Sequence, residues 1–229
     1  MNKCLLGDKP NIQRCHLLSY IGRIYSKAGD NDRALNYHLQ VVQMYESIFL
    51  SEFSAPLHSF DLVAYDYRQK KDYKKALEYL NKALYLIEVL HDDHLNVTCL
   101  YTLAHAGGLY IDLNDMQKAS YYYNKLLESC FTTLLNNENN ILYGISYAGL
   151  GRICLKQAEA EKGIAYLEKA LTIMQTHFPD DHSELLPLLI DLISPLQKID
   201  SLKAKEYQQW TERIKEKNER VRSLLLSKK

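Results

Sequence analysis

The sequence is poor in the residues that interrupt helices. Its 229 residues include only 9 glycines and 5 prolines, fewer than an average globular chain of this length contains. Proline cannot continue a helix normally, and glycine weakens one. This scarcity predicts a protein that is nearly all helical.

The sequence also lacks net charge. Its 28 Lys and Arg residues are balanced by 28 Asp and Glu residues, so the formal net charge is zero. Proteins that hold nucleic acid or an anionic membrane through their overall field carry an excess of basic residues. We therefore expect no nucleic acid and no membrane among the partners.

Long hydrophobic runs and an even set of cysteines are missing as well. No apolar run is long enough to span a bilayer, and no apolar signal segment follows Met1. The cysteines are scattered along the chain, at Cys4, Cys15, Cys99, Cys130 and Cys154. Because they fall mostly on apolar helix faces, we expect small buried side chains and no disulfide framework. Together these features favour a reducing, cytoplasmic location.

What the sequence does contain is an amphipathic helical segment that recurs. Residues 71–87 read KDYKKALEYLNKALYLI, with apolar residues at steps of three and four and lysines on the other face. Ala76 and Ala83 lie on the apolar face, with Leu80 between them. The small side chains predict close contact with a neighbouring helix.

The small residue at position 76 has counterparts in four other segments. They are Ala34, Ala119, Gly163 and Ala204. In chain order the five markers are separated by 42, 43, 44 and 41 residues. Such regular spacing indicates an internal repeat of two helices per unit.

A second apolar helix precedes each of the first four markers. It carries its own small residue, at Gly22, Ala64, Gly107 and Gly151 in the four units. An aromatic residue follows three positions later in the first three units, where the fourth has Cys154. A turn then leads into the second helix, as in Gly29-Asp30.

This arrangement resembles the tetratricopeptide repeat, and its period is similar to that of the kinesin-light-chain subtype. The resemblance covers nearly the whole chain and rests on repetition in register. It implies an all-α, right-handed α-solenoid of about five helix-turn-helix repeats with a C-terminal capping helix. It also implies a non-catalytic scaffold or adaptor for protein–protein interaction.

The domain organisation follows from the repeat. We expect a linker-like segment at 1–12, one solenoid domain over 13–226 and a tail at 227–229. The repeats are expected at about 13–50, 56–90, 95–135, 139–177 and 183–226. The expected helices are 13–27, 32–49, 57–69, 73–90, 96–113, 116–135, 141–156, 159–177, 184–199 and 201–226.

The fifth unit differs from the others. Its first helix is apolar nearly all round and contains Pro195, which bends or ends a helix. The last helix is expected to cover it, and the apolar residues available for this are Leu202, Tyr207, Trp210, Ile214, Val221 and Leu225. We interpret this unit as a cap on the array.

The candidate binding residues lie on the first helix of each pair. In such an array that helix lines the concave face, and residues one turn from the packing positions point into the groove. The peptide-binding candidates are His16, Tyr20, Arg23, Lys27, His58, Asp61, Tyr65, Arg68, Tyr101, His105, Arg152 and Lys156. Aromatic and arginine side chains are common binding anchors. The set favours an acidic peptide with aromatic or apolar side chains, bound extended or as a helix.

The resemblance does not extend to the residues that bind two known kinds of ligand in this family. Tetratricopeptide domains that grip a C-terminal carboxylate use paired Lys and Asn at the groove positions, and kinesin-light-chain repeats use asparagines there. Neither set is present. A chaperone tail and kinesin cargo are therefore not expected as ligands.

Catalytic and metal chemistry find little support. His91-Asp92-Asp93-His94 and the group His177, Asp180-Asp181-His182 have ligand types but lack helical spacing. We expect Asp93 or Asp181 to cap the helix that follows it. No nucleophile elbow or phosphate loop is present, since Gly149-Leu150-Gly151 lies within an apolar helical pattern. We expect no enzyme, no metal and no cofactor.

Two other functions remain open. Bacterial peptide-pheromone receptors carry similar arrays, but behind an N-terminal helix-turn-helix that residues 1–12 are too short to form. A structural role would instead use self-association through the edge at 13–27 or through the helix around 210–225. The sequence leaves the oligomeric state open.

Overall fold

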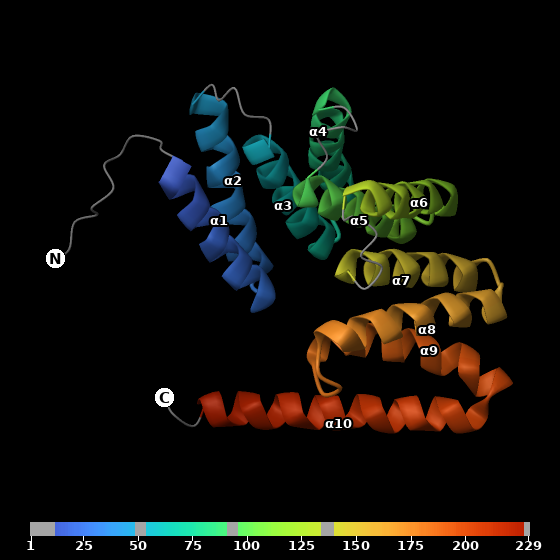
Figure 1. Cartoon of the computed structure of the whole chain (residues 1–229). Helices are drawn as coiled ribbons and strands as arrows, with labels where there is room; N and C mark the ends of the chain where they lie inside the picture. The colour runs from blue at the N-terminus through green and yellow to red at the C-terminus, as the bar shows by residue number, and fades with distance from the viewer. Residues whose placement is uncertain (1–11, 49–53, 91–95, 134–139, 227–229) are drawn as a thin grey trace. The chain divides into compact units, whose positions relative to one another are not determined.

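The computed structural model describes residues 12–48, 54–90, 96–133 and 140–226. Over these ranges the chain forms helices joined by short turns, without a strand (Figure 1). None of the helices in these ranges has the length and apolar character needed to cross a membrane. The expected all-α repeat architecture is confirmed.

The helices agree with the expected ones to within a few residues. They are α1 (Ile12–Lys27), α2 (Asn31–Ile48), α3 (Ser54–Gln69), α4 (Tyr73–Leu90), α5 (Val97–Asp112), α6 (Met116–Thr133), α7 (Ile141–Lys156), α8 (Ala160–His177), α9 (Leu186–Ile199) and α10 (Ser201–Leu226). A short 3-10 helix, Ser183–Leu185, leads into α9. In each repeat the odd-numbered helix is the first and the even-numbered helix is the second.

The chain divides into two compact units. The N-terminal unit, Met1–Leu113, contains α1 to α5, and the C-terminal unit, Asn114–Lys229, contains α6 to α10. In the N-terminal unit α1 packs on α2, α2 on α3 and α3 on α4. In the C-terminal unit α7 packs on α8, and α9 on α10. Consecutive helices along the chain are thus neighbours in space within each unit.

Four helix pairs share the same turn geometry. The residue two positions before the second helix has a left-handed backbone, with φ of 80° at Gly29, 61° at Lys71, 61° at Asn114 and 63° at Ala158. Only glycine adopts this conformation without steric cost, and asparagine tolerates it better than most other residues. The common turn therefore imposes a strained backbone conformation on Lys71 and Ala158.

An acidic residue after the turn caps most of the second helices. Its carboxylate accepts a hydrogen bond from the backbone N–H three residues later at Asp30, Asp72, Asp115 and Asp200. Such a cap satisfies a donor that the first helical turn leaves unpaired. Glu159 occupies the same place before α8 without a side-chain cap.

The repeat markers mark the closest packing. Ala34, Ala76, Ala119 and Ala204 are fully buried, and Gly163 is buried. A Cβ atom at Gly163 would lie 2.7 Å from Leu155 and 3.1 Å from the carbonyl oxygen of Gly151. Since real Cβ atoms do not approach other atoms so closely, α7 and α8 can meet only through small residues.

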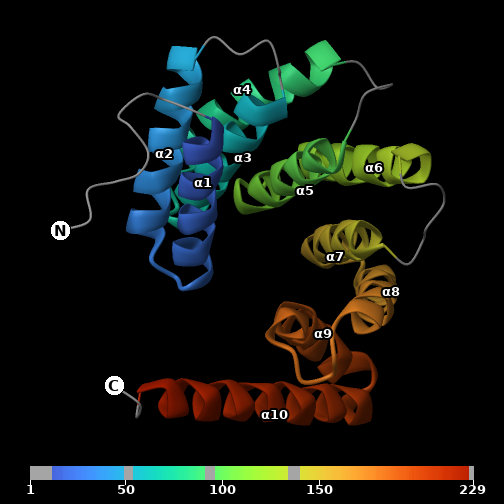
Figure 2. The ribbon, with the colours of Figure 1, turned by 60° about the vertical axis from the view of Figure 1, so that its left-hand side comes forward.

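The capping unit is built largely as expected (Figure 2). Leu189 and Leu192 of α9 are fully buried in a cluster with Ile214 of α10, and Tyr207 and Trp210 of α10 pack against it. The Trp210 indole N–H also donates to the backbone oxygen of Asp180.

Two details of the capping unit correct the sequence analysis. Leu202 is exposed, so the cover that α10 provides begins later in the helix. Ile190 of α9 is also exposed, so α9 is not covered all round. The helix continues through Pro195 to Ile199, and the side chains of Val221 and Leu225 lie outside the described set.

The left-handed turn generates a stability prediction. Replacing Ala158 by glycine relieves the steric cost of its positive φ, so we expect the free energy of unfolding to rise by about 0.5–1 kcal/mol. Urea denaturation followed by circular dichroism measures this change. The matched control is Ala165→Gly in the interior of α8, where glycine should instead lower the stability by about 1 kcal/mol. A loss of stability in both variants would contradict the account of the turn.

Candidate functional site

The structure places ten of the twelve candidate residues in the N-terminal unit, on α1, α3 and α5. Arg152 and Lys156 lie on α7, in the C-terminal unit. Eleven of the candidates are exposed or half-buried, and the exception is Asp61, which is 2% exposed. Because Asp61 has almost no free surface, its carboxylate contacts a neighbouring side chain and not the solvent.

That neighbour is His105. Its Nδ1 lies 2.9 Å and 3.0 Å from the two carboxylate oxygens of Asp61, so the ring of the α5 residue is held from α3. A carboxylate only accepts, so Nδ1 carries the hydrogen of this bond. The His105 ring also lies 5.1 Å from the ring of Tyr65, centroid to centroid. The three residues form one rigid group on neighbouring first helices.

His58 lies near this group and is half-buried. Burial lowers the pKa of its imidazole, and the positive charges of Arg23, His38 and His105 lower the pKa further. Asp61 opposes the shift. His58 therefore stays neutral near pH 7, with a hydrogen-bond donor and an acceptor on the same ring.

Two candidate arginines are tied to the next first helix. The Nε atom of Arg68 on α3 donates to Asp112 on α5 over 2.6 Å, and that of Arg152 on α7 donates to Asp191 on α9 over 2.5 Å. Gly108 makes room for the Arg68 guanidinium, because a Cβ there would lie 2.4 Å from Nη1. These aspartate partners were not predicted from the sequence.

The remaining cations on α1 differ from these arginines. Arg23 and Lys27 are exposed, and among the described residues no carboxylate forms an ion pair with either. The α1 sequence, IQRCHLLSYIGRIYSK, contains no acidic residue. Within the N-terminal unit, the exposed positive charge of the candidate residues is therefore concentrated on α1, and Lys156 on α7 is exposed as well.

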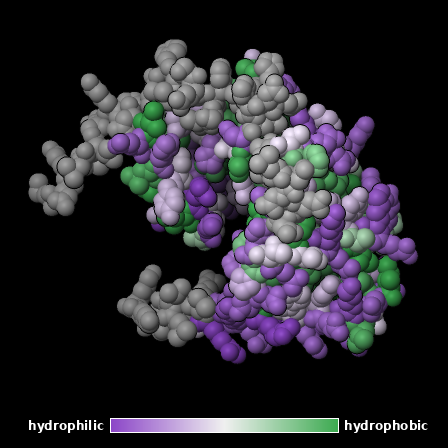
Figure 3. All heavy atoms as spheres, viewed as in Figure 1, coloured by the Kyte–Doolittle hydropathy of each residue, from purple (hydrophilic) through white to green (hydrophobic). Residues whose placement is uncertain are grey.

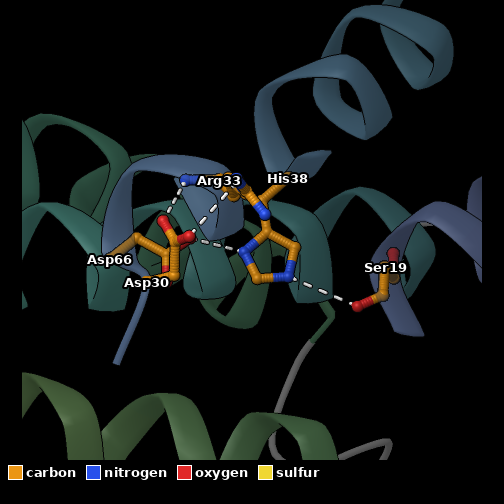
Figure 4. Close-up of polar contacts among 5 residues, drawn as sticks. All are labelled: Ser19, Asp30, Arg33, His38 and Asp66. Atoms are coloured by element: carbon orange, nitrogen blue, oxygen red, sulfur yellow. Dashed lines mark hydrogen bonds and ion pairs between the residues drawn. The ribbon is translucent and has the colours of Figure 1, made fainter. Parts of the chain in front are cut away.

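A buried ion pair connects α2 and α3 (Figure 4). His38 of α2 and Asp66 of α3 are 1% and 0% exposed, and His38 Nδ1 lies 2.5 Å from Asp66 Oδ2. On its other side the ring donates from Nε2 to the backbone oxygen of Ser19 over 3.4 Å. Gly22 leaves the space for the ring, because a Cβ there would lie 2.4 Å from Nε2. This pair joins the first repeat to the second.

Burial governs the protonation of the pair. It raises the pKa of the Asp66 carboxyl, while the hydrogen bond and the charge of His38 lower it by less. With Nε2 donating to Ser19, one further proton is shared between Nδ1 and the carboxyl group, so the pair has no net charge. A neutral pair avoids most of the cost of placing charge in a protein interior.

This pair was not predicted from the sequence, although signals for it exist. His38 falls on the same helical stripe as Ala34, Val41 and Tyr45, and Asp66 falls between apolar residues of α3. Each is a polar residue on a face that must be buried, and such residues need a partner. Register alone, however, does not show that the two meet.

Metal and thiol chemistry are not supported by the described residues. Within the described ranges no three His, Cys, Asp or Glu side chains are grouped to hold a metal ion. His91, Asp93 and His94 lie outside those ranges. The described cysteines, Cys15, Cys99, Cys130 and Cys154, are buried and free, and burial raises the pKa of Cys130 to about 11. Their thiols are therefore poor nucleophiles.

The proposed aspartate caps are replaced by other residues. Asn96 caps α5 by accepting a hydrogen bond from the backbone N–H of Cys99. The 3-10 helix before α9 is capped by His182, which accepts from the N–H of Glu184, so the expectation of an Asp181 cap was wrong. Asp181 instead pairs with Lys217 of α10.

Comparison with protein families decides the identity of the repeat. Three family descriptions, all of the tetratricopeptide repeat, match residues 15–52, 55–130 and 145–177. Together they cover more than half of the chain, and they fall on the helix pairs described above. The chain belongs to the tetratricopeptide-repeat family. No curated protein sequence matches it.

Solved structures show the same tetratricopeptide fold at low sequence identity. BtubC (BKLC) from P. vanneervenii is 18% identical with a TM-score of 0.65, over 92% of this chain and 80% of that one. A putative kinesin light chain of Podosopora anserina with nearly identical TPR-like repeats is also 18% identical, with a TM-score of 0.64 over 90% and 97%. The Rap conjugation gene regulator of plasmid pLS20, in complex with the Phr* peptide, is 14% identical with a TM-score of 0.72 over 96% and 60%.

His58 gives this tetratricopeptide array a specific pH dependence. Because its pKa is lowered from 6.5 in the folded protein, the unfolded chain binds its proton first as the pH falls below about 6.5. Its contribution to stability is therefore complete above that pH and is lost as the pH falls through the folded pKa, with a slope of at most about 1.4 kcal/mol per pH unit.

Replacing His58 by glutamine should flatten that part of the pH profile. Urea denaturation between pH 5 and pH 7.5 measures the free energy of unfolding, and the difference between the wild type and His58→Gln isolates the contribution. His16→Gln, which changes an exposed histidine of α1, serves as the control and should leave the slope as it is. If His58→Gln also leaves the slope as it is, the desolvation of His58 is not as described.

Proposed function

We propose that this protein is a non-catalytic interaction scaffold that binds a peptide or protein segment on the first helices of its N-terminal unit. We name this area the first-helix surface and define it by Tyr20, Arg23, Tyr65, Tyr101 and His105 on α1, α3 and α5. The family membership supports the proposal, because tetratricopeptide arrays present stacked helices as extended binding surfaces.

The observation that carries the proposal is the ordering of side chains on this surface. Tyr65 and His105 touch, His105 is held by Asp61, and Arg68 is held by Asp112. A side chain that is already fixed loses little conformational freedom on binding, so it contributes more of its contact energy. A surface that only faced solvent would gain nothing from this arrangement.

The charge of the surface indicates the ligand. Asp61 is covered by His105, and Asp112 is paired with Arg68, so the nearby acids are engaged. Arg23 and Lys27 remain available for carboxylates of a ligand, and exposed Tyr20 and Tyr101 offer aromatic contact. We propose an acidic segment with aromatic or apolar anchors.

A structural neighbour adds support for a peptide ligand. The Rap regulator of plasmid pLS20 has the same fold and was solved with the Phr* peptide bound. This chain spans 60% of that protein, so the likeness supports the helical array and not the rest of the regulator. The same neighbour favours a second candidate function, in which this chain is the ligand-sensing part of a regulator.

A peptide array tests the proposal with paired variants. Acidic peptides with aromatic or apolar residues should bind the wild-type chain and lose at least about tenfold in affinity in the double variant Arg23→Ala/Tyr101→Ala. The measurement is fluorescence anisotropy on the peptides that the array selects, with circular dichroism to verify folding. Arg68 is left in place because its loss would also free Asp112.

The matched control removes the same kinds of side chain from another surface. Lys82 and Tyr85 lie on α4, where Tyr85 is 64% exposed, and Lys82→Ala/Tyr85→Ala should bind as the wild type does. Equal binding by all three proteins, or an equal loss in both variants, would contradict the assignment of the first-helix surface.

A further inference from the structure

The first helix of the array carries an apolar stripe that faces solvent. Leu17, Tyr20 and Ile24 are 49%, 63% and 53% exposed. At helical spacing they lie on the face opposite buried Cys15 and Gly22, by which α1 packs on the rest of its unit. Hydrophobic residues reach the surface over α1 in the space-filling view (Figure 3). Three large neighbouring apolar side chains on one helix indicate a contact surface.

The later repeats show what this face is used for. Counted from the small residue that the first helices share, Leu17 stands five residues before Gly22. The residues at the same place in repeats two to four are Ser59, Thr102 and Ser146, and all three are buried. The hydroxyl group of each donates a hydrogen bond to a backbone oxygen of its own helix. At this position the other repeats pack, while the first repeat leaves a large apolar side chain exposed.

The position of Ile24 leads to the same conclusion. Two residues after the shared small residue, the later repeats have Asp66, Leu109 and Ile153, and all three are buried. Asp66 contacts His38 of α2, which is the second helix of the preceding repeat. The face of α1 that holds Leu17 and Ile24 is therefore the face on which a first helix receives a preceding helix. In the described part of the chain, no helix occupies that place on α1.

The charge around the stripe selects the kind of helix. α1 contains Arg14, Arg23 and Lys27 and no acidic residue, and Lys27 lies beside the stripe. Two copies joined through α1 would bring these cations together, and like charges across an interface are unfavourable. A helix that carries carboxylates beside its apolar face would meet the cations instead.

We propose that the α1 edge, defined by Leu17 and Ile24, docks an acidic amphipathic helix of a partner protein. The partner helix occupies the place that α2 occupies on α3, with apolar side chains over Leu17 and Ile24 and carboxylates toward Lys27 and Arg23. This goes beyond the first-helix surface and uses a different face of α1. Tyr20 borders both surfaces, and it is therefore left unchanged in the test.

The test uses two designed helical peptides of the same length and the same leucine stripe. In one peptide glutamates flank the leucines, and in the other lysines do. Fluorescence anisotropy with the full 229-residue chain should show that the glutamate peptide binds and that its affinity falls as salt is added. The lysine peptide should bind at least about tenfold more weakly.

Paired variants locate the binding. Leu17→Glu/Ile24→Glu should weaken binding of the glutamate peptide by at least about tenfold, because it places like charge on the edge. The matched control, Ile190→Glu/Leu202→Glu, changes two exposed apolar residues of the C-terminal unit and should bind as the wild type does. All four positions are exposed, and circular dichroism checks that both variants fold.

Three results would overturn the proposal. The first is that the two peptides bind equally or that neither binds. The second is that Leu17→Glu/Ile24→Glu binds the glutamate peptide as well as the control variant does. The third is that sedimentation velocity of the chain alone shows a dimer that Leu17→Glu/Ile24→Glu converts to a monomer, because the edge would then be an interface between copies. Arg23 borders both surfaces, but Leu17→Glu/Ile24→Glu leaves Arg23 unchanged and Arg23→Ala/Tyr101→Ala leaves Leu17 and Ile24 unchanged. The two pairs of variants therefore let the two proposals fail separately.

Discussion

The close approach of the two helices in the pairs α1–α2, α3–α4, α7–α8 and α9–α10 is the constraint on which the rest of the structure depends. Ala34, Ala76 and Ala204 are fully buried at the same place in their repeats, and at Gly163 even a methyl group would collide with Leu155. A larger side chain at any of these places would separate the pair and shift every residue that the next repeat packs against. The common turn, which keeps Lys71 and Ala158 in a left-handed conformation, serves the same geometry.

Once the pairs are fixed, polar contacts set how neighbouring repeats meet. The buried His38–Asp66 pair joins α2 to α3, and the ion pairs of Arg68 with Asp112 and of Arg152 with Asp191 join successive first helices. These contacts occupy side chains that would otherwise be free to bind. The side chains that remain available for binding are therefore few. They are the ordered aromatic and histidine side chains on α3 and α5, and the exposed cations beside the apolar stripe on α1.

The sequence was sufficient for the fold because its repeat carries the information several times. Each small marker residue predicts a helix pair at the same place in its repeat, so a repeat with a weak pattern can be assigned from the others. The predicted helix bounds accordingly agree with those of the structure to within a few residues. The pairing of the candidate residues with one another could not be predicted, because each pairing occurs once and is not repeated along the chain. The aspartates at 61, 112 and 191 decide which candidates are free, and pairing between helices some forty residues apart leaves no local pattern. The exposure of Leu202 has the same cause, since where α10 begins to cover α9 depends on packing and not on periodicity.

Hydrogen–deuterium exchange on the chain, with and without a peptide selected by the array, tests the central claim most directly. If the first helices of the N-terminal unit form the binding surface, bound peptide should slow exchange in α1, α3 and α5, and should leave the exposed part of α10 unchanged. Such protection follows because a bound ligand stabilises the helices that it contacts against local opening. Protection confined to α2 and α4, or to α10, would contradict the account.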